Sequence, residues 1–220
     1  MAQKLSNLPN RALIKFGKHQ IGSETAQPII WMVADKNHTG YPSNSVTLIT
    51  EKVIDIRPYD AKEGTWGNLD YKLSNINQWL NSEASAGNWY TATHSNDRAP
   101  STGNNAYSAR PGFLYNFTSA ERLKLLPTTL TVQTDKDYQE QTMTAKVFLP
   151  SEKEALGTSD FTQGGSKLAC FASVGTGAYV TAQVFANSHA NTIPDTIDTM
   201  MSYYTRTIYD EEVYTVYKSI

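Results

Sequence analysis

Apolar residues along this chain occur in short runs separated by polar, turn-forming stretches. Residues 12–17, 28–35 and 46–50 are such runs, and their β-branched and aromatic content predicts three strands, the first ending at Gly17. The run 28–35 shows no alternation, which predicts that both of its faces are covered. Residues 53–56 either extend the third strand or begin the next turn. The first quarter of the chain is therefore expected to be mainly sheet.

The stretch 73–81 is expected to organise the rest of the fold. Ile76, Trp79 and Leu80 fall at i, i+3 and i+4, so they make one face of a short helix apolar. Ser74 stands immediately before this face, where its hydroxyl can accept from a first-turn amide as an N-cap. A tryptophan on a two-turn helix buries a large area in one place. The pattern predicts packing against a sheet, which is a structural role and not a catalytic one.

Two further helix starts share one signature. Residues 118–121 (Thr-Ser-Ala-Glu) and 151–154 (Ser-Glu-Lys-Glu) both have the form of a capping box beside a hydrophobic run. The first helix is expected to continue through the leucines before Pro127, and the second is expected to end at Gly157.

Strands are predicted between and after these helices. Residues 129–133 alternate apolar and polar side chains, as a half-buried strand does. Its partner is predicted at 146–150, with 135–142 as the hairpin tip or a mobile loop. Near the end of the chain, 202–207 and 212–217 read as two more strands.

No internal repeat or linker divides the chain, so we predict one domain over residues 1–220. The order of elements indicates an α+β fold with short helices packed on a twisted, mostly antiparallel sheet and with long loops. Charged residues make up 18% of the chain, and Thr, Ser and Asn take their place beside 13 Tyr and 4 Trp. Adhesive surfaces and antibody paratopes use a similar mixture.

Charge and hydropathy exclude several classes of protein. The formal net charge is −2 and the basic residues are scattered, which argues against nucleic-acid binding. No apolar run approaches the about 20 residues of a membrane span, so no membrane insertion is expected. The first 16 residues lack the apolar core of a signal peptide. We therefore expect synthesis in a cytoplasm, followed by retention there, release by lysis or incorporation into an assembled particle.

Residues that could carry chemistry are few. The four histidines, His19, His38, His94 and His189, lie far apart and lack partners at metal-ligand spacing. Cys170, the single cysteine, lies in an apolar run and is expected to be buried. Asp35 and His38 share one turn-rich loop with no third partner in sequence, which favours an ordered turn. The sequence predicts no metal, no cofactor and no enzyme.

The order of motifs resembles a known family. They run as a Pro-Ile-x-Trp strand, VADKNHTGYPSNSVTLIT, SNINQWLN, GFLYNFTSAER, TTLTV, KVFLPSEKE and YYTRT. From Gly17 to about Tyr217 this series resembles the DUF6273 domain of phage virion proteins and Gram-positive surface proteins. Residues 32–51 are especially similar to versions encoded among phage structural genes.

The resemblance implies a C-type-lectin-like fold, similar to that of formylglycine-generating enzymes and phage tropism determinants. Such a fold would display variable loops on a compact core. The family transfers no catalytic residues, and the single cysteine disfavours formylglycine-generating chemistry.

The irregular stretch 82–112 is expected to face a partner, because long loops in compact domains are commonly functional. Aromatic rings can stack on sugar faces while amides and hydroxyls bond the sugar hydroxyls. The candidate ligand-binding residues are Trp89, Tyr90 and Tyr107, followed by Tyr41 and Trp66. Each of these rings can equally belong to the core.

The sequence departs from the family at its C-terminal end. Residues 206–208 read Arg-Thr-Ile where relatives have Arg-Thr-Pro, and relatives continue past the YTVY strand to a closing Val-Arg-Pro motif. Either the chain continues past Ile220, or the last strands are dispensable, or a neighbouring subunit adds a strand. We expect the third, since an unpaired edge invites aggregation. The predicted inter-subunit edge strand, in a homo-oligomer, consists of Glu212, Val213, Tyr214, Thr215, Val216 and Tyr217.

These observations predict a non-enzymatic bacteriophage virion surface protein: a capsid decoration, head fibre, tail or baseplate component. Its expected partners are other virion proteins and a bacterial surface glycan. A first alternative is a purely structural virion component that binds only other virion proteins. A second is a cell-wall hydrolase. Asp210, Glu211 and Glu212 could supply its paired carboxylates, although an acidic turn beside a strand is usually solvated.

Overall fold

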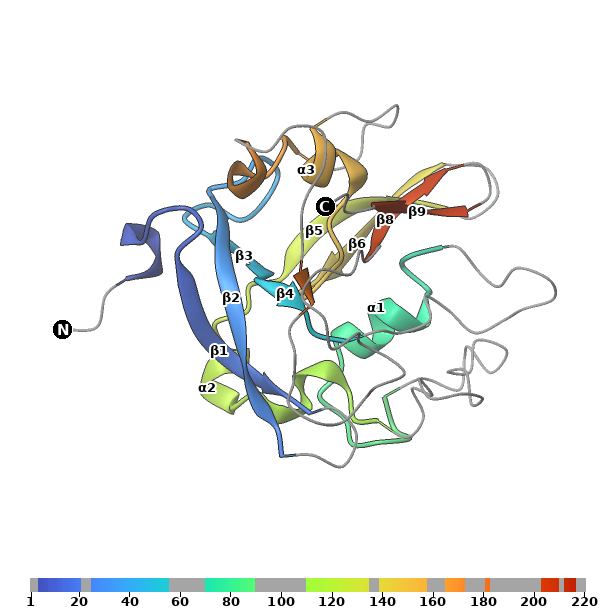
Figure 1. Ribbon diagram of the computed structural model, residues 1–220. Coiled ribbons are helices and arrows are strands. Elements are labelled where there is room, and N and C mark those ends of the chain that lie inside the picture. The colour runs from blue at the N-terminus through green and yellow to red at the C-terminus, as the bar shows by residue number, and fades with distance from the viewer. Residues whose placement is uncertain are drawn as a thin grey trace.

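The computed structural model describes residues 4–20, 25–55, 70–89, 110–134, 139–157, 165–172, 181–182, 203–209 and 212–216. Its strands are β1 (Leu13–His19), β2 (Gln27–Lys36), β3 (Val46–Thr50), β4 (Lys52–Val53), β5 (Thr128–Gln133), β6 (Glu140–Ala145), β7 (Thr181–Ala182), β8 (Tyr203–Tyr209) and β9 (Glu212–Val216). Its α-helices are α1 (Asn75–Leu80), α2 (Ser119–Arg122) and α3 (Glu152–Leu156), and its 3-10 turns include η1 (Leu5–Asn7), η4 (Phe113–Asn116) and η5 (Ala169–Phe171). Short helices on small, mostly antiparallel sheets place the fold in the α+β class, as predicted (Figure 1).

The three strands predicted first form one antiparallel sheet in the order β1-β2-β3. The prediction that Gly17 ends the first strand is wrong, because β1 continues to His19. The pairing with β2 shifts between Lys15 and Lys18, and Gly17 lies in this irregularity with φ of +67°. Glycine adopts this left-handed conformation without a Cβ penalty, so the strand forms a bulge and then resumes pairing.

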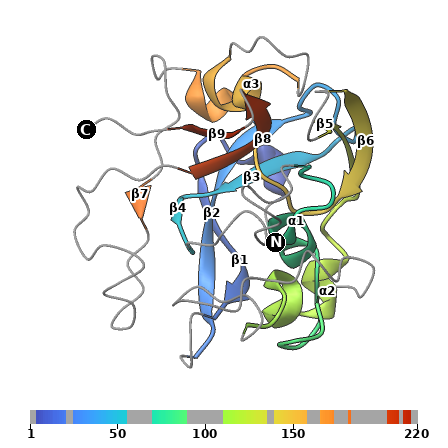
Figure 2. The ribbon, with the colours of Figure 1, turned by 90° about the vertical axis from the view of Figure 1, so that its right-hand side faces the viewer.

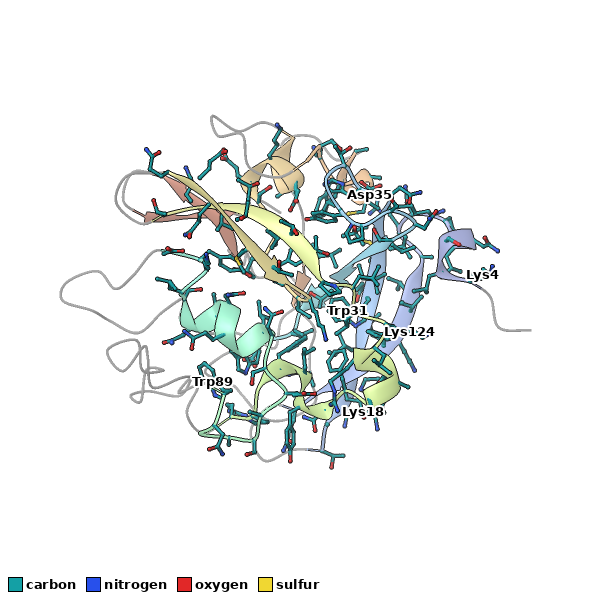
Figure 3. The ribbon with its side chains drawn as sticks, turned by 180° about the vertical axis from the view of Figure 1, so that it is seen from behind. Lys4, Lys18, Trp31, Asp35, Trp89 and Lys124 are labelled. Carbon is teal, nitrogen blue, oxygen red and sulfur yellow. The ribbon has the colours of Figure 1, made fainter. Side chains whose placement is uncertain are left out.

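Both faces of β2 are covered, as its unbroken apolar run predicted. Ile29 and Trp31 lie in the main hydrophobic core, and Trp31 lies at the centre of the molecule in Figure 3. Ala34 belongs to a second, smaller cluster with Leu168 and Phe171, which Met32 of the same strand flanks. The sheet is therefore packed on one side by the main core and on the other by the η5 segment.

Helix α1 is capped and buried as predicted. The amide of Asn77 donates to Oγ of Ser74 at 3.3 Å. Ile76, Trp79 and Leu80 are each at most 8% exposed and lie in the same core as the β2 side chains. The indole of Trp79 also donates from Nε1 to the carbonyl of Pro111 at 3.0 Å. A large apolar ring and one polar bond thus fix the helix against two different parts of the chain.

Both predicted capping boxes are present, at α2 and at α3. Gly157 ends α3 with φ of +87°, also as predicted. The expected continuation of α2 to residue 126 is wrong, since regular α-helix ends at Arg122. Leu123 is 82% exposed and Leu126 is 46% exposed, so these leucines bury little surface to stabilise further turns. Short helices depend on such packing more than on propensity.

The capping box of α2 leads to a testable pH dependence. Glu121 accepts from the Thr118 amide at 2.8 Å and from the Gly17 amide at 3.0 Å. These bonds, the one from the Thr118 backbone first, lower the pKa of Glu121 below its ordinary value of 4.5. A carboxylate with a lowered folded-state pKa stabilises the protein above pH 4.5, and this contribution is lost as the pH falls through the folded-state pKa.

We expect Glu121→Gln to lower the free energy of unfolding at neutral pH by about 1 kcal/mol. The variant should also lose less stability than the wild type between neutral and acid pH, measured by urea unfolding with tryptophan fluorescence. Glu51→Gln, which removes a carboxylate after β3 and leaves both capping boxes intact, is the control. Equal acid sensitivity in wild type and Glu121→Gln would show that this carboxylate does not contribute.

The strand β5 is confirmed, with Leu130 and Val132 buried on one face. The predicted partner strand at 146–150 is wrong, because β5 pairs with β6, in the register Thr128↔Ala145 to Gln133↔Glu140. The hairpin tip predicted over 135–142 is correspondingly too long, since β6 already starts at Glu140 and residues 135–138 lie outside the described part.

The segment after β6 is held by side chains instead of a neighbouring strand. The amides of Lys146 and Val147 donate to Oδ1 of Asn81, and the amide of Leu149 donates to the hydroxyl of Tyr71. Because side chains accept from these amides, the segment does not require hydrogen bonds to a neighbouring strand. The apolar content of residues 146–150 therefore predicted partial burial correctly, but it predicted the wrong secondary structure.

The last strands form two small sheets. Strand β4, within two residues of β3, pairs in parallel with β7 through Lys52↔Thr181. The two strands predicted at 202–207 and 212–217 are present as β8 and β9, which pair antiparallel, and β8 extends to Tyr209. Helix α3 contacts both β8 and β9, and β8 also contacts β5. Figure 2 shows this hairpin beneath α3, on the far side of the molecule from α2.

Candidate functional site

The predicted ligand-binding rings separate into two groups. Trp66, Tyr90 and Tyr107 lie outside the described residues. Trp89 is described and is 5% exposed within the main core, so its ring face is covered where it stands. Tyr41 is half-buried and also packs against this core. Stacking on a sugar by either ring would require its present neighbours to move.

The chain enters and leaves the stretch 90–109 from one anchored base. The buried Trp89 directly precedes this stretch. After it, the amide of Gly112 donates to the carbonyl of Ala84 at 2.9 Å. The amide of Leu114 donates to the carbonyl of Ser82, also at 2.9 Å. At Gly112 a Cβ would lie 2.3 Å from the Ser82 carbonyl oxygen, so the two backbones are in close approach. We call residues 82–89 and 110–114 the loop base.

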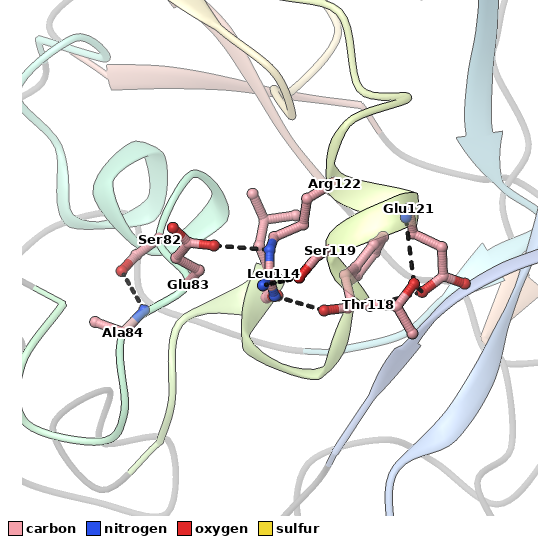
Figure 4. Close-up of polar contacts among 9 residues, drawn as sticks. Ser82, Glu83, Ala84, Leu114, Thr118, Ser119, Glu121 and Arg122 are labelled. Carbon is pink, nitrogen blue, oxygen red and sulfur yellow. Dashed lines mark hydrogen bonds and ion pairs between the residues drawn. The ribbon is translucent and has the colours of Figure 1, made fainter.

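An arginine ties the loop base to α2 (Figure 4). Nε of Arg122 lies 2.7 Å from Oε2 of Glu83. The same guanidinium donates from its terminal nitrogens to the carbonyls of Leu114 and Phe117 and to the hydroxyl of Ser119. A guanidinium is planar and has several N–H donors, so it can hold separate segments of the chain in a fixed relative geometry. The 82–112 connection is therefore closed at its base by backbone bonds, a buried tryptophan and this arginine.

A second polar cluster joins the β2–β3 connection to α3. Nδ1 of His38 lies 2.8 Å from Oδ2 of Asp35, and Nε2 of His38 lies 3.8 Å from Oε1 of Glu154. Tyr41 donates its hydroxyl to the same Glu154 oxygen at 2.5 Å. Asp35 and His38 are hydrogen-bonded within one turn, as predicted, and they also have a third partner that the sequence did not show. Glu154 supplies it from 113 residues beyond Tyr41, and in sequence it was visible only as a capping residue.

A second histidine is also paired with a carboxylate. Nε2 of His19 lies 2.8 Å from Oδ2 of Asp55. The imidazole is 5% exposed and packs edge-on against Trp79 and at a tilt against Phe113, with ring centroids 5.8 and 5.6 Å apart. Sequence spacing gave no signal for this pair, because its members lie 36 residues apart on separate elements. The contacts support a structural role under the loop base.

The single cysteine lies among the described residues. Cys170 is 1% exposed, as predicted, and burial raises the pKa of its thiol to about 12. A thiol in this state is a poor nucleophile at neutral pH. In the described ranges, no three His, Cys, Asp or Glu side chains are grouped to hold a metal. Within the same ranges, no helix has the length and apolar character needed to cross a membrane.

The predicted inter-subunit strand is present as β9, which covers residues 212–216, while Tyr217 lies outside the described residues. One edge of β9 pairs with β8 of the same chain, from Tyr203↔Val216 to Tyr209↔Glu212. A strand from a second subunit would therefore have to add to the other edge. Pairing between subunits stays a prediction.

Taken together, these features define an α+β scaffold that carries a long connection on an anchored base. The chain belongs to the DUF6273 family, a domain of unknown function whose family model matches residues 43–219. The match begins in the connection between β2 and β3 and includes α1, α2, α3 and β3 to β9. No curated protein and no solved structure matches the chain.

Proposed function

We propose that this protein is a non-enzymatic binding protein of a bacteriophage virion surface, and that the connection above the loop base contacts its ligand. The closed base is the observation that carries the proposal. Rigid elements that bring the two ends of a long connection together are a common way to present a binding loop. His19, His38 and Glu154 are buried and bonded to other parts of the chain, and such structural roles accord with a binding function.

The virion location and the lectin-like arrangement are parts of the same proposal. The location is proposed from the resemblance of residues 32–51 to versions of the DUF6273 domain encoded among phage structural genes, as stated in the sequence analysis. Short helices and small antiparallel sheets accord with a C-type-lectin-like core. The Tyr, Asn and Ser content of the chain suits a bacterial surface glycan as the ligand.

The test is binding of the purified full chain to Gram-positive cell walls, measured by co-sedimentation. Tyr90→Ala and Tyr107→Ala should each weaken binding by about tenfold, as loss of one interface aromatic typically does. Tyr115→Ala is the matched control, because this tyrosine is 47% exposed and lies on η4, outside the connection. Trp89→Ala is unsuitable, because removing a buried tryptophan would destabilise the core.

Three outcomes would contradict the proposal in different ways. Absence of cell-wall binding, together with retention on purified virion proteins, would favour the purely structural role. An equal loss of binding in Tyr115→Ala would place the contact elsewhere on the surface. Release of soluble saccharide from the walls would identify a hydrolase.

A further inference from the structure

The side chain of Arg122 contacts both halves of the loop base (Figure 4). We call residues 82–89 the first leg of the loop base and residues 110–114 the second leg. Nε of Arg122 lies 2.7 Å from Oε2 of Glu83, on the first leg. A terminal nitrogen of the same guanidinium donates to the carbonyl of Leu114, on the second leg, at 3.3 Å. One side chain therefore joins the segment that leads into the 90–109 connection to the segment that follows it.

These contacts form a closed ring of hydrogen bonds. The carbonyl of Leu114 accepts from Arg122, while the amide of Leu114 donates to the carbonyl of Ser82 at 2.9 Å. Ser82 immediately precedes Glu83, the other partner of Arg122. The legs are thus bridged twice, once directly between their backbones and once through the guanidinium. Because the donors of a planar guanidinium have fixed directions, the ring restrains the relative orientation of the legs as well as their separation.

Helix α2 attaches this ring to the first sheet. Arg122 also donates to the carbonyl of Phe117, whose ring lies in the main core. The neighbouring residue, Glu121, accepts from the amide of Gly17 in the β1 bulge at 3.0 Å. Two consecutive residues of one helix therefore bond different parts of the molecule, one the sheet and the other the loop base.

The exposure of the ion pair indicates that its effect is local. The side chain of Glu83 is 66% exposed and that of Arg122 is 26% exposed. Ion pairs as exposed as this contribute little to global stability. Their loss can still loosen the one place where they join two segments, because proteins open locally at a lower free energy than they unfold globally.

We propose that Arg122 is a positioning residue for ligand contact, which acts by holding Glu83 and Leu114 to α2. This inference rests on the proposed function, in which the connection above the loop base contacts the ligand. Legs that are already fixed before binding reduce the ordering cost that the complex must overcome. Arg122 thereby increases the affinity for the ligand without touching it.

Hydrogen exchange of the full chain without ligand tests whether Arg122 holds the legs. Arg122→Lys keeps the positive charge but cannot supply the several directed donors of a guanidinium. We expect it to lower the protection factors of the Gly112 and Leu114 amides by about tenfold and to leave those of the β5 amides unchanged. Lys124→Ala, at an exposed position two residues later, is the control. Unchanged protection at both loop-base amides, or an equal fall in β5, would overturn the inference.

Variants of Glu83 separate the geometry of the contact from its charge. Glu83→Gln keeps an oxygen that can accept from Nε of Arg122, whereas Glu83→Ala removes the acceptor. Protection of the Leu114 amide in Glu83→Gln should stay within about twofold of the wild type, and in Glu83→Ala it should fall. Equal falls in both variants would show that charge, and not a directed bond, holds the first leg.

Co-sedimentation with Gram-positive cell walls tests the consequence for binding. Arg122→Lys should bind about fivefold more weakly than the wild type, and Lys124→Ala should bind equally well. If exchange at the loop base increases in Arg122→Lys but its binding does not weaken, the positioning role is overturned while the proposed function stands. If the wild type itself does not bind, the proposed function fails and the positioning role fails with it, whereas the exchange result still decides whether Arg122 holds the legs.

Discussion

Gly17→Ala should be among the most destabilising single-methyl substitutions in this protein, lowering the free energy of unfolding by about 3 kcal/mol or more. Gly17 has φ of +67°, and a Cβ placed there would lie 2.2 Å from the Phe117 ring. The Phe117 ring belongs to the main core, and it packs edge-on against Phe16 at 5.7 Å between ring centroids. The methyl group would therefore displace a core aromatic in addition to straining the backbone.

Gly40→Ala separates the two contributions. Gly40 has φ of +88°, but a Cβ there would have no atom within 4 Å. Backbone strain alone should cost about 1 kcal/mol at this position. Urea unfolding of both variants at neutral pH gives the comparison. Equal losses would show that the Phe117 ring yields without cost and that only the backbone conformation matters at the bulge.

The second large effect is expected at Asn81, which stands at the end of α1. Its Oδ1 accepts from the amides of Lys146 and Val147 at 2.8 and 3.2 Å, and its Nδ2 donates to the Val147 carbonyl at 2.9 Å. Asn81→Ala removes the partner of the half-buried Val147 backbone and of the exposed Lys146 amide, which water can then solvate, so we expect a loss of about 2 kcal/mol in unfolding free energy. Asn81→Asp keeps the acceptor and loses the donor, so its loss should be smaller than that of alanine.

The matched control is Asn88→Ala. Asn88 is exposed, and its side chain bonds only nearby groups of its own turn in the described part of the chain. Surface substitutions of this kind usually change stability by less than about 0.5 kcal/mol. A near-neutral Asn81→Ala would mean that water replaces the asparagine and that the segment after β6 is held by Tyr71 and its apolar side chains.

The sequence was sufficient to predict the structure wherever residues close together in the chain determined it. Ser74 and the residues of both capping boxes satisfy amides within three residues, so their sequence positions alone set the helix starts. The apolar spacing of Ile76, Trp79 and Leu80 likewise predicted which helix face is buried. The errors arose where a distant group intervened. Gly17 read as a strand end because the Phe117 ring that accompanies the bulge is not visible in local sequence.

The same contrast explains the polar clusters. The sequence determined that Asp35 and His38 form an ordered turn, since three residues separate them and a short polar loop favours local bonds. It also determined the α+β class and the resemblance to the DUF6273 family. Only the tertiary structure decided that Glu154 faces His38, that Asp55 faces His19 and that Trp89 is buried. Those pairings depend on how elements pack across the core, and local hydrogen bonding and periodicity carry no information about that packing.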